Sequence, residues 1–267
     1  MIQLKPLTIV KLGGSVITHK ESSPPKINEE NLTRIAKELG SHKGELIVIL
    51  GGGAHGHQAA HSFGYADPQS PKELLLKGIP IIRRNMQELA SSVASVLMNE
   101  EIPAVVISPF CSVTLRNGFI HDFSTNVIRT ALDNGLTIVT HGDVCFDEKS
   151  AAAILSGDTI AVYLTEQLDA KSILIGTDVD GVLDDNPKTN PSAKHIPIIN
   201  HENKEDILSK TGPSTSTDVT GGMSKKVREL LEIAKQDREI VIFNLTVPNR
   251  LESLLKNEST ICTRIEL

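Results

Sequence analysis

The sequence has few aromatic residues and no tryptophan. Aromatic side chains make up 3% of its 267 residues, so bases of a nucleic acid would find few rings on which to stack. The formal net charge is −6, which also argues against a protein that binds the phosphate backbone of DNA or RNA. We therefore expect no nucleic-acid partner.

Cysteines and long apolar segments are also scarce. The three cysteines, Cys111, Cys145 and Cys262, are far apart and form neither a metal-ligand spacing nor a disulfide framework. No apolar run approaches the length of a membrane span, and residues 1–10, which include Pro6, lack the apolar core of a signal peptide. We expect small, mostly buried cysteines, no membrane partner and a location in the reducing cytoplasm.

Hydrophobic residues make up 39% of the chain and charged residues 22%, an ordinary globular composition that argues against disorder. Predicted strands and helices alternate nearly throughout, which favours a mainly parallel sheet covered by helices on both faces. The predicted strands are 7–12, 46–50, 104–107, 136–140, 172–176, 240–243 and 261–264, with a hairpin at 113–120. The predicted helices are 29–39, one starting near 58, 80–98, 125–134, 159–168 and 226–235, and residues 65–77 are expected to form a loop.

A run of three glycines, Gly51–Gly53, follows the strand 46–50 directly. Glycines after a strand let backbone amides approach an anion, and the N-terminus of the next helix adds partial positive charge. His57 would lie in the first turn of that helix and could donate a hydrogen bond to the same anion. Taken alone, the motif fits a tight turn with two solvated histidines, His55 and His57, equally well.

Three further glycine motifs occur in comparable places. Gly13–Ser15 follows the first strand, while residues 156–158 and 217–223 open helices. In a parallel sheet such turns meet at the carboxyl ends of the strands, where ligands bind. Lys11 interrupts an apolar strand, which is costly unless its ammonium meets an anion or a carboxylate. For Asp158, a simple helix cap is the alternative to a functional role.

Together these motifs resemble the amino acid kinase superfamily over almost the whole chain. Residues 11–15 are similar to its first nucleotide turn, and Gly51–Gly53 to its substrate turn. Residues 177–182 and 218–223 resemble its adenine-nucleotide motifs. The resemblance implies a three-layer αβα sandwich around a mainly parallel sheet. It also implies an acceptor-binding lobe at 1–170 and a nucleotide-binding lobe at 171–267, within one continuous domain.

Within the superfamily, the sequence is most similar to the isopentenyl phosphate kinase family. His57, Lys20 and the turn at residues 156–158 carry this likeness, whereas His55 and Gln58 depart from that family's usual aromatic residue and proline. The resemblance implies an enzyme of isoprenoid biosynthesis and the mevalonate pathway. Its reaction would transfer the γ-phosphoryl group of ATP to isopentenyl phosphate, with Mg²⁺, and give isopentenyl diphosphate.

The resemblance also implies a role for individual residues, with no protein side chain expected to hold a metal. The implied catalytic residues are Lys11, Lys20, His57, Asp158 and Lys226. The implied nucleotide-binding residues are Lys11, Gly13, Gly14, Ser15, Gly53, Asp178, Leu183, Asp184, Lys188, Gly222 and Lys226. The residues implied to grip the acceptor phosphate are Gly52, His57 and Gly157. The isopentenyl tail would need an apolar pocket, which we expect to be lined from the long helix after Pro80 and from the hairpin near Val113.

Two alternatives remain open. One is a related kinase with another acceptor, such as fosfomycin kinase, which shares the glycine–histidine turn and a segment like residues 114–118. The other is a nucleotide-binding storage or regulatory protein without turnover, against which Lys11, Lys20 and Lys226 argue. We expect a homodimer, because dimers are the commonest closed assembly.

Overall fold

The computed structural model describes residues 6–185, 190, 192–210, 222–235 and 237–267. Eight of the described strands form the central sheet, in the spatial order β14-β16-β15-β11-β1-β4-β8-β5. They are β1 (Leu7–Leu12), β4 (Glu45–Leu50), β5 (Ala104–Val106), β8 (Thr137–His141), β11 (Ser172–Thr177), β14 (Ile198–Ile199), β15 (Glu239–Asn244) and β16 (Cys262–Ile265).

The strands from β15 to β5 are parallel, and β16 pairs antiparallel with β15. All six residues of β1 are buried, as expected for a parallel strand covered on both faces. Val10 lies in register with Val48 of β4 and Leu174 of β11. Because parallel strands end at one edge of a sheet, the turns after β1, β4, β8 and β11 meet there.

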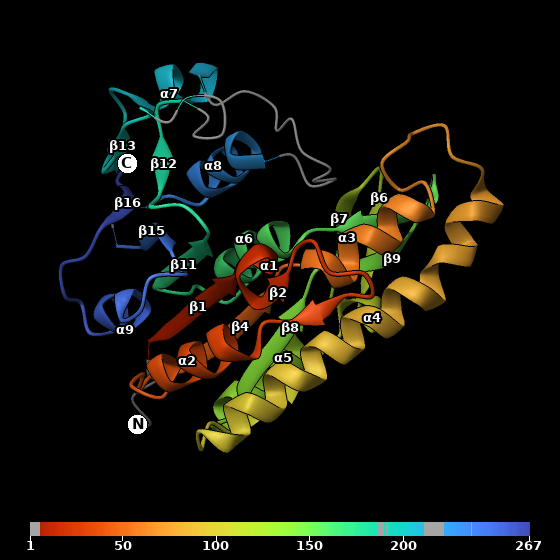
Figure 1. Cartoon of the computed structure of the whole chain (residues 1–267), viewed down its shortest axis with the longest axis horizontal. Helices are drawn as coiled ribbons and strands as arrows, with labels where there is room; N and C mark the ends of the chain where they lie inside the picture. The colour runs from red at the N-terminus through yellow and green to blue at the C-terminus, as the bar shows by residue number, and fades with distance from the viewer. Residues whose placement is uncertain (1–5, 186–189, 191, 211–221, 236) are drawn as a thin grey trace.

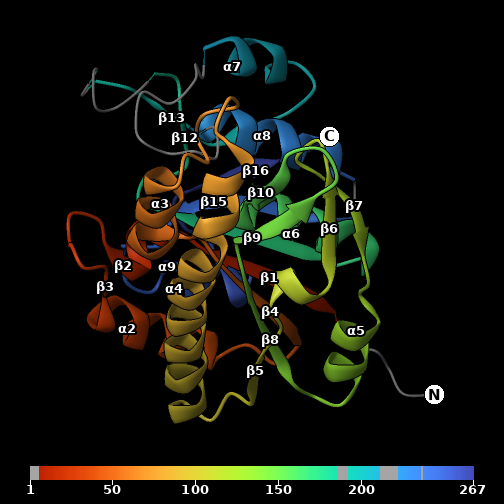
Figure 2. The same ribbon diagram turned by 90° about the vertical axis from the view of Figure 1, so that its right-hand side faces the viewer.

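Helices cover both faces of this sheet. One face packs against α2 (Glu29–Leu39), α4 (Lys72–Asn99) and α9 (Arg250–Leu255), and includes Val10 and Val48. The alternate residues Ile9 and Ile47 belong to the other face, with α5 (Asn126–Asp133), α6 (Gly157–Gln167) and α8 (Gly222–Glu232). Figure 2 shows the sheet between α2 and α4 on one side and α5 and α6 on the other. The predicted three-layer sandwich is confirmed.

A smaller sheet, in the order β10-β9-β6-β7, lies beside the main one. Its strands are β6 (Val113–Arg116), β7 (Phe119–Phe123), β9 (Asp143–Asp147) and β10 (Ala151–Leu155). The hairpin predicted around Asn117-Gly118 is confirmed. Both turn residues have positive φ, as the two central residues of a type I′ hairpin turn require. The strands β9 and β10 were not predicted.

The remaining described elements lie outside the two larger sheets (Figure 1). They are α1 (Gly14–Ile17), β2 (Thr18–His19), β3 (Lys26–Ile27), α3 (Gly53–Ser62), the 3₁₀ turn η1 (Pro109–Cys111), β12 (Val182–Leu183), β13 (His195–Ile196) and α7 (Lys204–Lys210). The helix expected from about residue 58 therefore begins earlier, at Gly53. No helix within the described ranges has the length and apolarity needed to cross a membrane.

The prediction that the long helix starts at Pro80 is wrong. The helix α4 begins at Lys72, which also turns the second half of the expected loop at 65–77 into helix, and Pro80 lies inside it. An internal proline removes one backbone hydrogen bond and strains the preceding turn. Ile79 and Ile82 are buried on either side of it, so packing against the core outweighs the local penalty.

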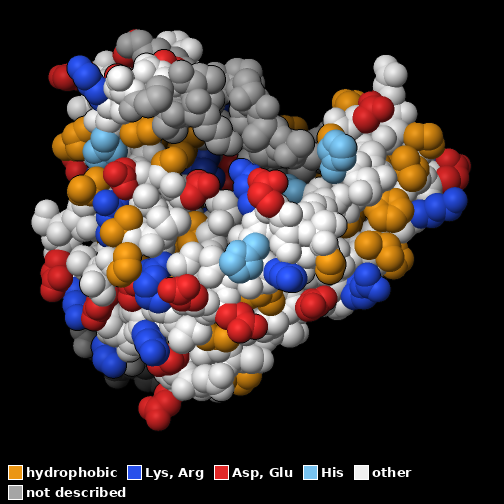
Figure 3. Space-filling view, viewed as in Figure 1, with side chains coloured by type: hydrophobic (Ala, Val, Ile, Leu, Met, Phe, Trp, Pro, Cys, Tyr) orange, Lys and Arg blue, Asp and Glu red, His pale blue; other side chains and the backbone are white. Residues whose placement is uncertain are grey.

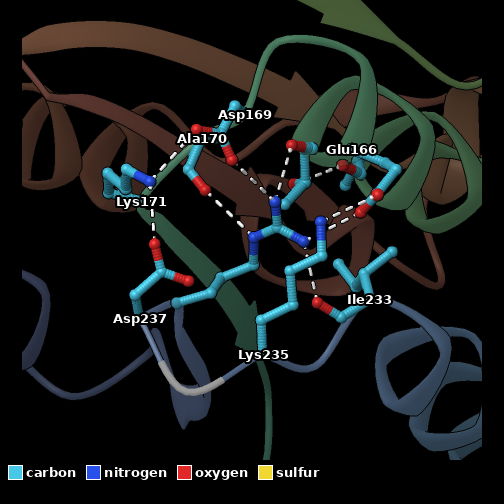
Figure 4. A network of polar contacts seen from close by, with 10 residues as sticks. Glu166, Asp169, Ala170, Lys171, Ile233, Lys235 and Asp237 are labelled. Carbon is cyan, nitrogen blue, oxygen red and sulfur yellow. Dashed lines mark hydrogen bonds and ion pairs between the residues drawn. The ribbon is translucent and has the colours of Figure 1, made fainter.

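The C-terminal ends of α6 and α8 are tied together by a buried arginine. Arg238 is 6% exposed and donates hydrogen bonds to the carbonyls of Ala170, just after α6, and Ile233, just after α8. Its guanidinium also pairs with Glu166 at 2.9 Å, and Lys235 Nζ pairs with the same carboxylate at 2.9 Å. Figure 4 shows these groups converging from both helices. The two helices are thereby fixed relative to each other at this end.

Candidate active site

A cleft of about 840 Å³ opens at the carboxyl edge of the sheet, where the turns after β1, β4, β8 and β11 come together. Figure 3 shows this side of the molecule hollowed, with charged and histidine side chains gathered around the hollow. The predicted site residues that line the cleft are Lys11, Gly13, Gly14, Ser15, Lys20, Gly52, Gly53, His57, Gly157, Asp158, Asp178, Gly222 and Lys226.

The first two glycine turns contact each other beneath the cleft. A Cβ on Gly14 would lie 2.2 Å from the backbone nitrogen of Gly53, and Gly53 itself has a φ of +49°. Side chains at these two positions would push the turns apart. Thr18 links them as well, because its hydroxyl donates to the Gly14 carbonyl at 2.8 Å and accepts from the Ala54 amide at 3.0 Å. The sequence offered no signal for this role of Thr18.

Lys11, Asp158 and Lys226 form the charged centre of the cleft. The Oδ1 atom of Asp158 lies 3.1 Å from Lys11 Nζ, and its Oδ2 atom lies 2.5 Å from Lys226 Nζ. The side chains of Lys11 and Lys226 are 9% and 11% exposed. The carboxylate is thus the counter-ion that the buried strand position of Lys11 requires. It comes from α6, whereas the lysines come from β1 and α8.

Burial on its own would raise the pKa of Asp158. The positive charges of Lys11 and Lys226 outweigh this effect and hold the pKa below its ordinary value, so the carboxylate is ionised throughout the neutral range. Asp158 is not the helix cap: Ser156 Oγ accepts from the Thr159 amide at 3.0 Å and caps α6. Asp158 lies in the first turn of α6, where the helix dipole also favours a negative charge.

The residues predicted to grip the acceptor phosphate all line the cleft. Gly52 and His57 come from the turn after β4 and from α3, and Gly157 opens α6. Lys20 follows β2 directly and is exposed. His55 is buried outside this lining, and burial lowers its pKa. The structure thus distinguishes the two histidines of the turn.

The predicted nucleotide-binding residues are only partly brought together. Asp178, after β11, and Gly222, at the start of α8, line the cleft. Leu183 in β12 and Asp184 after it do not contribute to the described lining, and Lys188 lies outside the described residues. Most of the expected motif at 218–223 also lies outside them.

The loop that carries Asp178 is anchored by its neighbour Asp180. Oδ1 of Asp180 accepts from Arg250 at 2.6 Å and from Asn244 at 3.1 Å. Asp180 therefore shapes this turn from outside the cleft, an arrangement that sequence reasoning missed.

Part of the cleft is apolar. Ile82 and Met86 reach it from α4, Ile154 from β10 and Ala60 from α3. The long helix was expected to contribute here, but the second contribution comes from β10 rather than from the hairpin near Val113. A cleft with an ionic centre and an apolar end can accommodate a ligand that has both a phosphate and a hydrocarbon part.

The described residues contain no group of three or more His, Cys, Asp or Glu side chains that could hold a metal ion. The acidic side chains of the cleft do not form such a group either, because Asp158 is engaged by two lysines. A divalent cation in this cleft would need most of its ligands from a phosphorylated compound and water.

An αβα sandwich with lysines and glycine turns gathered at the carboxyl edge of its sheet defines a protein that binds phosphorylated small molecules. Residues 6–244 match the model of the amino acid kinase family, and the chain belongs to that family. It is 36% identical to an isopentenyl phosphate kinase of Methanothermobacter thermautotrophicus, over 97% of this chain and 98% of that protein.

Two further comparisons agree. An isopentenyl phosphate kinase of Methanocaldococcus jannaschii is 36% identical, over 94% of this chain and 96% of the other. A solved structure of isopentenyl phosphate kinase superimposes with a TM-score of 0.84 at 33% identity, covering 97% of this chain and 99% of that one. The similarity therefore extends over the whole fold, including the segments that form the cleft.

Proposed function

We propose that the protein is an ATP-dependent kinase that phosphorylates isopentenyl phosphate to isopentenyl diphosphate for isoprenoid biosynthesis. The observation that carries the proposal is the cleft itself, in which Lys11, Asp158 and Lys226 lie between two glycine turns and beside an apolar end. The full-length similarity to isopentenyl phosphate kinases supports the same acceptor.

In the proposed reaction an oxygen of the acceptor phosphate forms a bond to the γ-phosphorus of ATP. The bond from that phosphorus to the β,γ-bridging oxygen breaks, and ADP leaves. The acceptor oxygen is already ionised near neutral pH, so the site needs no strong general base. It must instead bring two polyanions together and neutralise charge on the transferring group.

The lysines of the cleft suit this demand. We assign Lys11 and Lys226 to the ATP phosphates and the moving phosphoryl group, and Lys20, directly after β2, to stabilisation of the transition state. Asp158 keeps the first two lysines charged and oriented. The glycine turn at 13–15 and Gly53 would supply backbone contacts to the nucleotide phosphates.

The acceptor would lie between α3, α4 and α6. Gly52, His57 and Gly157 would hold its phosphate, because backbone amides and an imidazole donate hydrogen bonds to phosphate oxygens. The isopentenyl tail would then extend toward Ile82 and Met86, where apolar contact favours a hydrocarbon over the compact polar body of fosfomycin.

We propose that Mg²⁺ enters with the nucleotide. The donor set of the cleft fits this role, since phosphate oxygens and water can supply the ligands that its side chains do not. Bound in this way, the ion would neutralise phosphate charge during transfer.

The test is a panel of acceptors given to the purified protein with ATP and Mg²⁺. Isopentenyl phosphate, fosfomycin and a short-chain carboxylate are compared by coupled ADP release, and the diphosphate product is identified by phosphorus NMR. We expect turnover with isopentenyl phosphate and an activity at least about 100-fold lower in the Lys226→Ala variant, which excludes a contaminant. Turnover confined to fosfomycin, or ATP binding without any turnover, would refute the proposal.

We also propose a division of labour within one continuous domain. Residues 1–170 would carry the acceptor site, including His57, and residues 171–267 much of the nucleotide site, including Asp178. Single substitutions distinguish the acceptor site from the nucleotide site. His57 variants should alter the KM for the acceptor, and Asp178 variants should alter the KM for ATP. The reverse pattern would overturn the division.

We propose that the protein is a homodimer. Phe119 of β7, Phe146 of β9 and Val127 of α5 are large apolar residues that are 74%, 50% and 67% exposed, and a dimer interface would cover side chains of this kind. Light scattering should give twice the 28.9 kDa mass of one chain. A mass of one chain at micromolar concentration would refute the dimer.

We propose a cytoplasmic location. Cys111, Cys145 and Cys262 are all free in the structure, which is typical of a reducing compartment. Fractionation of cells that produce a tagged protein should place it with cytoplasmic markers, and recovery with an oxidising compartment would contradict this.

A further inference from the structure

The helices α6 and α8 are joined by a second polar bridge beside the catalytic one. Thr159 Oγ1 donates a hydrogen bond to Glu229 Oε1 at 3.0 Å. The same hydroxyl lies 2.9 Å from Ser156 Oγ, the cap of α6. The first bridge, between Lys226 and Asp158, uses the residue before Thr159 and the residue three positions before Glu229. Lys226 and Glu229 are three positions apart and so share one face of α8, while Asp158 and Thr159 are consecutive in the first turn of α6.

Burying the carboxylate of Glu229 at this position costs free energy. Its side chain is 18% exposed, and its second oxygen, Oε2, is buried with no hydrogen-bond partner among the described residues. Burial raises its pKa, and Lys225 approaches it only to 3.7 Å. A buried, partly unsatisfied carboxylate costs free energy, so a purely stabilising role would be served better by an apolar side chain.

The position of the Glu229 carboxylate between α6 and α8 suggests that it controls how closely the two helices approach. Arg238 clamps the C-terminal ends of α6 and α8, so the approach of their N-terminal ends is the freedom that remains. That approach decides where the Lys226 ammonium lies relative to Asp158 and Lys11. Glu229 and Thr159 hold the helices together, and neither residue is itself part of the described cleft lining. A displacement of about 1 Å at a reacting group can cost about 100-fold in rate.

We infer that Glu229 is a positioning residue, which holds α8 against the start of α6 through Thr159 and so keeps Lys226 in place for phosphoryl transfer. The inference rests on the proposed function, because it assigns Glu229 to the same transfer step. It predicts that Glu229 acts on kcat rather than on the affinity for either substrate.

The first experiment compares three variants of α8. Glu229→Ala should lower kcat by about 10- to 100-fold with little change in either KM, because the helices lose their bridge while the binding groups remain. Glu229→Gln keeps an oxygen that accepts from Thr159 and should retain kcat within about threefold. The matched control is Glu232→Ala, which removes an exposed glutamate from the same helix and should leave kcat and thermal stability unchanged.

The second experiment asks whether Glu229 acts through Lys226. In a Lys226→Ala background, single-turnover rates should be the same with and without Glu229→Ala, within about twofold, because the group being positioned is already gone. Thr159→Val should reproduce the loss seen with Glu229→Ala, and Thr159→Ser, which keeps the hydroxyl, should restore the rate.

Independent, additive losses in the Lys226→Ala background would overturn the inference. So would a Glu229→Ala protein with wild-type kcat, or one whose loss follows its melting temperature and is shared by Glu229→Gln. Failure of the proposed function looks different, because the wild-type protein would then not phosphorylate isopentenyl phosphate. In that case the Glu229 and Lys226 variants are compared again with the acceptor that the panel identifies.

Discussion

Asp158→Asn tests the charge arrangement of the cleft most directly. Asparagine has nearly the shape of aspartate, so the substitution removes the negative charge and little else. The carboxylate lies 3.1 Å from Lys11 Nζ and 2.5 Å from Lys226 Nζ, and both lysine side chains are largely buried. Without it, two largely buried ammonium groups lose the counter-ion that α6 supplies to both of them.

The size of the effect follows from these distances. Two unit charges 3.1 Å apart attract by about 5 kcal/mol at an effective dielectric constant of about 20. Measurements of broken buried pairs give a similar loss, about 3–5 kcal/mol. For a chain of this size, each kcal/mol lowers the melting temperature by about 2–4 °C. We therefore expect Asp158→Asn to melt about 6–20 °C lower in the absence of nucleotide.

Nucleotide should reverse part of this loss. At the proposed nucleotide site the phosphates of ADP would bring negative charge to the same lysines, so ADP should stabilise the variant more than it stabilises the wild type. Its affinity for ADP, measured by calorimetry, should be unchanged or tighter, whereas kcat should fall by about 100-fold because the lysines are no longer held in place. A variant with normal stability and activity would refute this reasoning. Loss of ADP binding would show instead that Asp158 contacts the nucleotide or its metal ion.

Three further predictions concern single side chains. Lys226→Ala should lower kcat by about 100-fold in steady-state assays. Lys225→Ala, which removes a half-exposed lysine, should change kcat by less than about threefold. The reverse result would assign the stabilisation of the transferring group to Lys225. His57→Ala should raise the KM for isopentenyl phosphate by about tenfold while calorimetry finds ADP affinity unchanged, and His57→Gln should keep part of the affinity. Burial lowers the pKa of His55, so only the unfolded chain gains its proton as the pH falls through about 6.5, and stability is lost in that window. His55→Phe should therefore lose less melting temperature between about pH 7.5 and about pH 5.5 than the wild type, and an equal drop in both proteins would contradict this.

The layers of the fold could be predicted because the central strands consist mainly of branched apolar residues. The run at 46–50 is branched and apolar, and it forms β4 from Glu45 to Leu50. By contrast, β10 is Ala151–Leu155, and its alanines have little preference for a strand. The predicted start of the long helix at Pro80 is also wrong. Packing against the core instead places the start of α4 at Lys72.

The candidate site could be predicted only where a residue carries its own signal. Glycine turns after strands and a lysine in an apolar strand are visible in the sequence, and Lys11 does meet a carboxylate in the structure. Thr159 and Glu229 show no such signal. They are 70 residues apart, and each alone is an ordinary residue of an amphipathic helix. Their contact follows from the packing of α6 on α8, which no local pattern encodes.

The start of α6 shows why a helix cap and a counter-ion need not compete for one residue. Ser156 satisfies the Thr159 amide, so Asp158 is not needed as a cap and its carboxylate can face the two lysines. Gly157, between them, packs close to β4: a Cβ there would lie 2.9 Å from the Leu50 carbonyl oxygen. Three consecutive residues therefore cap the helix, admit the neighbouring strand and supply the negative charge. Because these tasks fall in one turn, a shift of α6 would displace Gly157 and the counter-ion of the two lysines together. The contacts of α6 with α8 near its start and with Arg238 near its end oppose such a shift.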